Sequence, residues 1–121
     1  MNATHYIDGR RVASEGSATI DVIDPSDGQK FGEIARGTAA DIDTAVRAAR
    51  QAMGDNFDGP WGEMTALQRG RLLGKLGAAV MAHHEELAQL EARDTGKALR
   101  VARNDATALA RYMEYLSLIH I

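Results

Sequence analysis

The 121-residue sequence contains no cysteine, only one tryptophan and few other aromatic residues. Without cysteine, the chain can form no disulfide, no thiolate metal site and no thiol nucleophile of its own. No apolar run approaches the roughly 20 residues of a transmembrane helix, and the amino terminus lacks the basic start and hydrophobic stretch of a secretory signal. These absences predict a soluble, cytoplasmic protein that does not enter a membrane.

The charges are nearly balanced and are scattered along the chain. Lysine and arginine number 14, and aspartate and glutamate number 17, which gives a net charge of −3 at pH 7. A nucleic-acid-binding protein usually carries a cluster of basic residues, which this sequence does not have. We therefore expect no nucleic acid and no membrane among its partners, and the length predicts one modest domain.

The first 37 residues are rich in turns and contain short runs that can form strands. Asp8-Gly9 lies between two such runs, and this pair supplies the positive φ angles of a two-residue hairpin turn. A further strand is expected around residues 19–23, and the turn at 24–28 should lead into another near Lys30. Residues 1–37 are therefore predicted to be rich in β-structure.

Helical periodicity begins at Thr38, and the pattern predicts about four helices over residues 38–116. Thr38 with Asp41 and Thr65 with Gln68 have the spacing of capping boxes, and Gly54 should end the first helix. The apolar positions expected to face inward are Ile42, Val46, Ala49 and Met53; Leu72, Leu73, Leu76 and Val80; Leu87 and Leu90; and Val101, Leu109, Ala110, Met113 and Leu116. The residues alone predict a mostly α-helical fold with a small amino-terminal β-section, and they name no function.

The segment EARDTGKAL, residues 91–99, places a glycine before a lysine, as phosphate-binding loops do. A P-loop needs several glycines and a Gly-Lys-Ser/Thr ending between a strand and a helix, whereas this segment follows a helix and has one glycine. The favoured interpretation is that Gly96 ends the helix and that Lys97 is a solvated charge near that end. Neither interpretation explains Asp94, because a carboxylate is disfavoured near the carboxyl end of a helix.

The run His83-His84-Glu85-Glu86 contains residue types that bind metals. Adjacent helical residues point about 100° apart, whereas metal-binding pairs on a helix need a spacing of four residues. A solvated helix start is therefore favoured over a zinc site.

Stretches that begin with YIDGRRV, VIDPSDG and WGEMTAL follow one another within about residues 5–115, and this order resembles the amino-terminal part of the aldehyde dehydrogenase superfamily. That family's opening hairpin is similar to YIDGRRV, and its Asn-Pro turn and first helix are similar to VIDPSDGQKFGEIARGTAADIDTAVRAARQAM, with Asp24 in place of the usual asparagine. Its next helices are similar to WGEMTALQRGRLLGKLGAAVMAHHEELAQLEARDTGKAL, with Ala98 where proline is common. The resemblance implies an α/β parent, of whose coenzyme-binding domain residues 1–121 are the amino-terminal part.

The same resemblance implies an oxidoreductase that converts aldehydes to carboxylic acids with NAD or NADP, through a thiohemiacetal on a cysteine. The family's nucleophilic cysteine, general-base glutamate, oxyanion-binding asparagine and cofactor motifs all lie in later segments that no residue here matches. The resemblance therefore implies no catalytic and no cofactor-binding residue in this chain. It implies a truncated, inactive fragment that binds no cofactor itself, and a full-length parent that forms a homo-oligomer and takes an aldehyde substrate.

One binding site of the family has counterparts in this sequence. Several members hold a sodium or potassium ion through main-chain carbonyls before the Asn-Pro turn and through the aspartate of the Asp-Thr-Gly-Lys motif. The matching residues are Val22, Ile23 and Asp94. Oxygen ligands of this kind suit a hard monovalent cation. The alternative is that Asp94 caps a turn or pairs with Arg93, Lys97 or a nearby arginine.

The resemblance fails after Tyr115, where the chain reads LSLIHI. We interpret residues 117–121 as a non-native tail, with a true stop as the alternative. The alternative function is a free-standing helical module that binds another protein through uncovered apolar stripes and has no catalytic activity.

Overall fold

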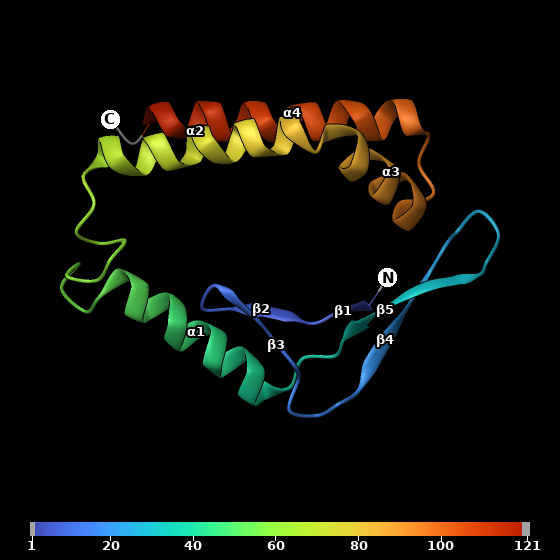
Figure 1. The fold of residues 1–121 in the computed structure, drawn as a ribbon, viewed down its shortest axis with the longest axis horizontal. Helices are drawn as coiled ribbons and strands as arrows, with labels where there is room; N and C mark the ends of the chain where they lie inside the picture. The colour runs from blue at the N-terminus through green and yellow to red at the C-terminus, as the bar shows by residue number, and fades with distance from the viewer. Residues whose placement is uncertain (1, 120–121) are drawn as a thin grey trace. The chain divides into compact units, whose positions relative to one another are not determined.

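The computed structural model describes residues 2–119 (Figure 1). The strands are β1 (Asn2–Ala3), β2 (His5–Ile7), β3 (Arg10–Val12), β4 (Thr19–Ile23) and β5 (Lys30–Ala35). The helices are α1 (Ala39–Met53), α2 (Ala66–Ala82), α3 (His84–Thr95) and α4 (Leu99–Ile119). This order confirms the predicted fold, with four helices in the described residues and a small β-section before them. Of the predicted tail, residues 117–119 belong to α4, and residues 120–121 lie outside the described part of the chain.

The chain divides into two compact units, which we call the strand unit and the helical unit. The strand unit contains β1 to β5 and α1, in residues up to 23 and from 28 to 63. The helical unit contains α2, α3 and α4 together with the turn at residues 24–27. None of the helices in residues 2–119 is long and apolar enough to cross a membrane.

The strand unit contains the predicted hairpin. Strands β2 and β3 pair antiparallel, with His5 opposite Val12. The turn residues Asp8 and Gly9 have φ angles of 54° and 72°, as a two-residue hairpin turn requires. A second sheet has the strand order β1-β5-β4, in which β4 and β5 are antiparallel and the pairing shifts between Val22 and Ile23.

Helix α1 has the predicted ends but not the predicted inward face. Thr38 and Asp41 form a full capping box, and Gly54 is the carboxyl cap. However, Ile42 is 63% exposed and Val46 is 45% exposed, so the expectation of an inward apolar stripe is wrong here. The helix contributes the first-turn carboxylate of Asp41 to the interior of the unit instead.

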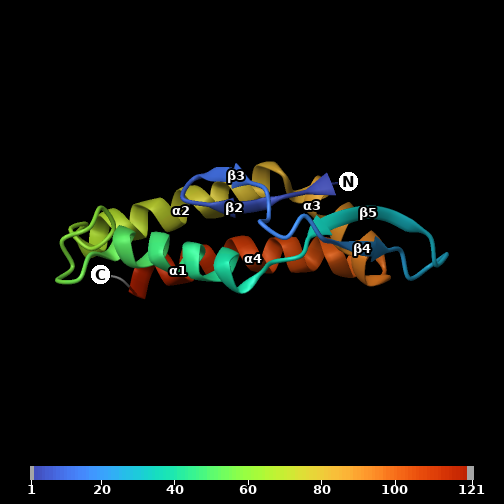
Figure 2. The same ribbon diagram turned by 90° about the horizontal axis from the view of Figure 1, so that it is seen from below.

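Helices α2 and α4 of the helical unit run alongside each other (Figure 2), with close contacts between small residues. A Cβ atom added at Gly70 would lie 2.5 Å from the Ser117 carbonyl oxygen, and one added at Gly77 would lie 3.1 Å from that of Ala110. These contacts show that α2 and α4 run antiparallel with their backbones close together. The buried apolar core of the described residues consists of Ala88, Ala102, Ala106 and Ala110.

The large apolar side chains of the helical unit lie mostly at the edges of this narrow interface. Leu90 was predicted to face inward and is 40% exposed, because the buried position on α3 belongs to Ala88. Leu72 and Leu76 on α2 are also exposed. Hydrophobic periodicity finds the helices but does not identify which apolar residues form their interface.

Candidate functional site

The three residues predicted to bind a monovalent cation lie at the ends of two elements. Val22 and Ile23 end β4, and Asp94 is the second-last residue of α3. The first two belong to the strand unit and Asp94 belongs to the helical unit, so their meeting in one site stays a prediction.

The turn after β4 is organised by the carboxylate of Asp24. Its Oδ1 atom accepts hydrogen bonds from the Ser26 backbone N–H at 2.9 Å and from the Ser26 hydroxyl at 2.6 Å. Its Oδ2 atom accepts a hydrogen bond from Nε of Arg93 at 3.3 Å. The bonds from Ser26, and then the Arg93 guanidinium, lower the pKa of Asp24 below its usual value. Within the helical unit, this carboxylate joins the turn to the carboxyl end of α3.

The segment 91–99 is joined to α4 through Lys97. Its ammonium donates to Glu91 Oε1 at 2.6 Å and to Asp105 Oδ2 at 2.9 Å. These two bonds raise the pKa of Lys97, and the bond to Glu91 has the larger effect. The interpretation of Lys97 as a merely solvated charge is therefore wrong, whereas Gly96 ends α3 in the predicted left-handed conformation, with φ 72°.

Asp94 differs from its neighbours because it has no partner of its own. It is exposed, and it forms no hydrogen bond or ion pair with any of the residues 2–119. Pairing with Lys97 or a nearby arginine, the alternative to an ion, is therefore not what the described residues show. The proposed donors are one carboxylate and two main-chain carbonyls, an all-oxygen set that fits sodium or potassium in its chemistry.

The residues of the His83–Glu86 run have separate partners and do not converge on one point. His83 Nδ1 lies 3.0 Å from Glu86, and His84 Nε2 lies 2.8 Å from the Arg103 carbonyl oxygen. Glu85 accepts two bonds from the Arg103 guanidinium, which lower its pKa to about 2. Across the described range, no group of three histidine, cysteine, aspartate or glutamate side chains is arranged to hold a metal.

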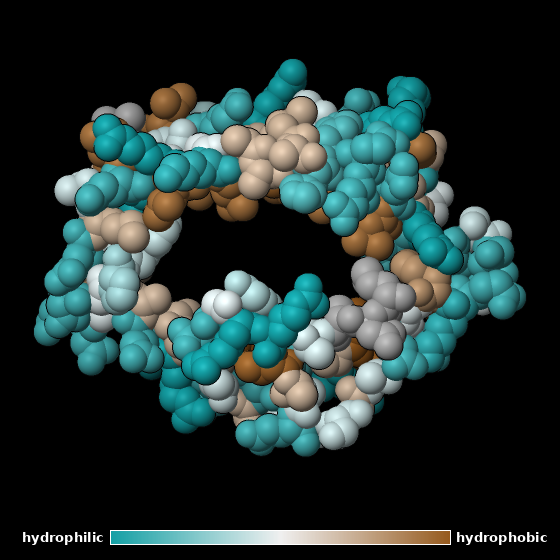
Figure 3. Space-filling model, in the orientation of Figure 1, coloured by the Kyte–Doolittle hydropathy of each residue, from teal (hydrophilic) through white to brown (hydrophobic). Residues whose placement is uncertain are grey.

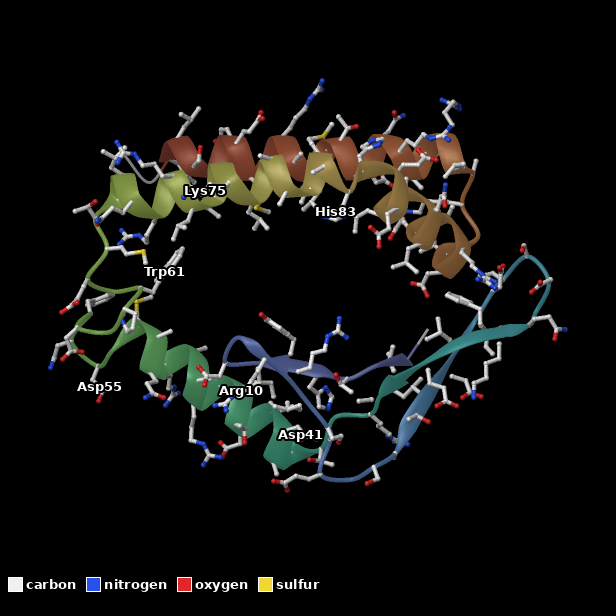
Figure 4. The ribbon with its side chains drawn as sticks, viewed as in Figure 1. Arg10, Asp41, Asp55, Trp61, Lys75 and His83 are labelled. Atoms are coloured by element: carbon white, nitrogen blue, oxygen red, sulfur yellow. The ribbon has the colours of Figure 1, made fainter. Side chains whose placement is uncertain are left out.

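The strongest polar cluster surrounds the buried carboxylate of Asp41 in the strand unit (Figure 4). Its Oδ2 atom accepts bonds from the Ser14 hydroxyl at 2.6 Å and from the Thr38 backbone N–H at 2.8 Å, and Oδ1 accepts one from the Glu15 N–H at 3.3 Å. The bond from Ser14, followed by that from the Thr38 backbone, holds the pKa of Asp41 well below its usual value. His5 Nε2, which is buried, lies 3.6 Å from the same carboxylate. Asp41 therefore ties the start of α1 to the segment after β3.

Sequence reasoning found only part of this cluster. The capping box of Thr38 and Asp41 was predicted from their spacing, but Ser14 lies 27 residues from Asp41. No local pattern marks such a pair, so it could be found only from the fold.

Comparison with known proteins identifies the family. A model of the aldehyde dehydrogenase family matches residues 12–118. This chain belongs to the aldehyde dehydrogenase family.

Relatives and solved structures of aldehyde dehydrogenases agree with this assignment. The chain is 41% identical over 112 residues to the putative aldehyde dehydrogenase DhaS of Bacillus subtilis (strain 168), a match that covers 91% of this chain and 22% of that protein. The structure of a putative aldehyde dehydrogenase from Burkholderia cenocepacia is 55% identical with a TM-score of 0.88, and the match covers 93% of this chain and 23% of that one. The structure of PnpE in complex with nicotinamide adenine dinucleotide is 40% identical with a TM-score of 0.90. That match covers 98% of this chain and 24% of the PnpE chain. The chain thus spans about a quarter or less of the length of these aldehyde dehydrogenases.

The described residues contain one connection that leads from a strand directly into a helix. A phosphate is usually held at the start of a helix that follows a strand and a glycine-rich turn. Within residues 2–119, the only strand followed directly by a helix is β5, and the connection to α1 has one glycine, Gly37. The first turn of α1 is already capped by Thr38 and Asp41, and that of α2 by Thr65 and Gln68.

Proposed function

We propose that this chain is the amino-terminal part of an NAD- or NADP-dependent aldehyde dehydrogenase. The whole protein oxidises an aldehyde to a carboxylic acid through a thiohemiacetal on a cysteine outside these residues. One observation carries the proposal, the similarity of nearly the whole chain to PnpE, whose structure contains nicotinamide adenine dinucleotide. The proposal includes a homo-oligomer and a cytoplasmic location for the whole protein.

The 121 residues serve as scaffold in this proposal. They contain no cysteine, so the covalent step has no nucleophile within them. The alternative of a free-standing interaction module has weaker support, because the family match covers residues 12–118, nearly the whole chain.

The activity is tested by comparing the chain with a chimera. Residues 5–116 replace the matching segment of the Burkholderia cenocepacia protein, and NADH formation is followed with a short aliphatic aldehyde. We expect turnover by the chimera and by the intact Burkholderia protein, and none by the 121-residue chain. A folded chimera without activity beside an active Burkholderia protein would contradict the proposal, as would turnover by the isolated chain.

We also propose that the main-chain carbonyls of Val22 and Ile23 and the carboxylate of Asp94 bind sodium or potassium in the whole protein. Two observations support this, the all-oxygen donor set and the absence of another partner for Asp94 among the described residues. The proposed ligands are also adjacent in sequence to a hydrogen-bonded pair. Asp24 follows Ile23 directly and is hydrogen-bonded to Arg93, the neighbour of Asp94.

The ion is tested by the dependence of stability on the type of salt. In the chimera, we expect potassium or sodium chloride to raise the melting temperature above that in choline chloride at equal ionic strength. The isosteric substitution Asp94→Asn should remove this difference, whereas Asp55→Asn, at an exposed loop position, should keep it. An unchanged salt preference in Asp94→Asn would exclude that carboxylate as a ligand.

A further inference from the structure

His5 is a half-buried histidine of β2 whose ring faces the interior of the strand unit. Along β2, His5 and Ile7 are half-buried, whereas Tyr6 between them is 72% exposed. This alternation is the pattern of a strand with one covered face, and it places His5 on that face. The ring lies against the backbone of Gly37, where an added Cβ atom would be 3.6 Å from its Cε1 atom.

The Nε2 atom of His5 is the one buried side-chain nitrogen or oxygen atom of residues 4–119 that has no hydrogen-bond partner. Hydrophilic residues cover much of the strand unit in Figure 3, and polar groups at such a surface can bond to water. A buried nitrogen cannot do so, and a polar group left without a partner in the interior costs folding free energy. The neutral ring of His5 is therefore poorly satisfied in its position.

A carboxylate oxygen lies close to this nitrogen. Oδ2 of Asp41 is 3.6 Å from His5 Nε2, a distance too long for a hydrogen bond but short for two opposite charges. The side chains of His5 and Asp41 are 21% and 9% exposed, so salt and water screen the pair only weakly. Hydrogen bonds from Ser14 and from the Thr38 backbone hold the pKa of Asp41 well below its usual value, so this carboxylate is ionised at neutral pH. A proton on His5 would place a positive charge beside a fixed negative one.

Asp41 is the only carboxylate of residues 4–119 within 4 Å of a ring nitrogen of His5. Arg10 of β3 shares the covered face of the hairpin, but its guanidinium is paired with Asp8 at 2.9 Å, and Arg11 lies on the other face. A charged His5 therefore meets Asp41 directly. The other titratable or charged side chains in residues 4–16 and 36–53 are Tyr6, Glu15, Arg36, Asp43, Arg47 and Arg50.

We propose that His5 and Asp41 form a proton-dependent latch between the amino-terminal hairpin and α1. When His5 takes up a proton, its charge is attracted to the Asp41 carboxylate and holds β2 to the start of α1. When the ring is neutral, this attraction is absent and the hairpin is held less tightly. Both residues belong to the strand unit. The inference goes beyond the proposed function, because it concerns the stability of this chain and not the reaction of the whole protein.

The latch predicts that folding becomes more favourable as the pH falls through the histidine range. A histidine in an unfolded chain titrates near pH 6.5, by the ordinary value of about 6.5 for this side chain. Because the latch makes the folded chain hold the proton more tightly, the stabilisation is complete below that pH and is lost as the pH rises above it. The loss of stability caused by protonation of Asp41 begins only below about pH 5. Folding should therefore be most favourable between about pH 5 and 6.

Urea denaturation of the 121-residue chain at pH 8, 7 and 6 tests the latch. The variant His5→Gln keeps a polar side chain of similar reach that cannot become charged. The matched control is His83→Gln, because His83 also lies beside a carboxylate, 3.0 Å from Glu86, but at an exposed position. Asp41→Asn and the double variant His5→Gln/Asp41→Asn complete the comparison. The same set is measured in the chimera, which contains all of these positions and serves where the isolated chain has no measurable transition.

We expect the folding constant of the unmodified chain to rise by roughly two- to sixfold from pH 8 to pH 6, the change produced by a proton held about three- to tenfold more tightly in the folded state. His5→Gln should remove most of this rise. His83→Gln should keep it, since an exposed pair contributes little. In the Asp41→Asn background, His5→Gln should no longer alter the pH dependence. If Asp41→Asn does not fold, the comparison of His5→Gln with His83→Gln decides.

The latch is overturned if His5→Gln and the unmodified chain have the same pH dependence between pH 8 and 6. It is also overturned if the effect of His5→Gln persists in the Asp41→Asn background, or if the unmodified chain loses stability over this range, since burial of the charge would then outweigh its attraction to Asp41. The assay follows unfolding and not turnover. Failure of the latch therefore leaves the enzyme assignment intact, and an inactive chimera leaves the latch standing.

Discussion

Asp41 joins several polar groups of the strand unit. Its carboxylate receives hydrogen bonds from Ser14, Thr38 and Glu15, and His5 lies beside it. A buried carboxylate with this many donors is stable only in its ionised form, because the neutral acid cannot accept all of these bonds. The same carboxylate also caps α1, so one side chain both caps its own helix and bonds to residues far away in the sequence.

The lowered pKa of Asp41 predicts a loss of stability in acid. In the unfolded chain this group titrates near the ordinary aspartate pKa of 3.8, and in the folded chain it titrates well below that value. Below about pH 5, the unfolded state therefore binds more protons than the folded state. The contribution of Asp41 to folding stability is complete above that pH and decreases below it. We expect the folding constant to fall by up to about tenfold per pH unit from this group.

Urea denaturation at pH 7, 5, 4 and 3 measures this effect. Asp41→Asn should be less stable than the unmodified chain at pH 7, and the gap should narrow toward pH 3. Asp43→Asn, whose carboxylate is exposed, is the matched control and should follow the unmodified chain. If the free energies of unfolding of Asp41→Asn and the unmodified chain changed in parallel with pH, Asp41 would not titrate as described.

At the scale of elements, the α2–α4 pair depends on glycine where the backbones meet. A Cβ atom at Gly70 would lie 2.5 Å from the Ser117 carbonyl oxygen, whereas one at Gly74, one turn later on α2, would meet nothing within 4 Å. Gly70→Ala should therefore destabilise the helical unit by about 1–3 kcal/mol through overpacking. Gly74→Ala should stabilise it by up to about 1 kcal/mol through helix propensity.

The two glycine substitutions are compared by urea denaturation followed by circular dichroism at 222 nm. They add the same methyl group to the same helix, so intrinsic helix propensity cancels between them. Equal stabilisation by both would mean that α2 and α4 do not approach each other at Gly70.

The elements that sequence reasoning predicted are those whose signals lie within a few residues. The Asp8-Gly9 turn, the capping boxes at Thr38 and Thr65, and the helix end at Gly96 were all found in this way. Each depends on the conformation of adjacent residues, which the local sequence determines.

The parts that were not predicted depend on how distant elements pack. The periodicity of α3 pointed to Leu90, but the close helix interface accepts Ala88 instead. The bridge from Lys97 to Asp105 and the bond from Ser14 to Asp41 join residues of different elements. The proposed cation ligands belong to different units, so only their chemical types could be judged.

At the scale of the whole molecule, the chain exposes more surface than its mass requires. Its accessible surface is 8659 Å² for 13.1 kDa. A compact monomer of this mass would expose roughly 6,400 Å², and two separate compact bodies of half the mass would together expose roughly 7,700 Å². Taken separately, the two units therefore expose more surface than compact bodies of their mass would. Among the described residues, no large side chain is fully buried.

This excess surface predicts that the isolated chain is marginally stable. A core of alanines removes little apolar area from water, so the free energy of unfolding should be small and the urea transition broad. We expect the isolated chain to bind the dye 1-anilinonaphthalene-8-sulfonate while it keeps its helical circular dichroism, and we expect the chimera to bind much less. A sharp transition without dye binding in the isolated monomer would show that the exposed apolar residues need no further cover.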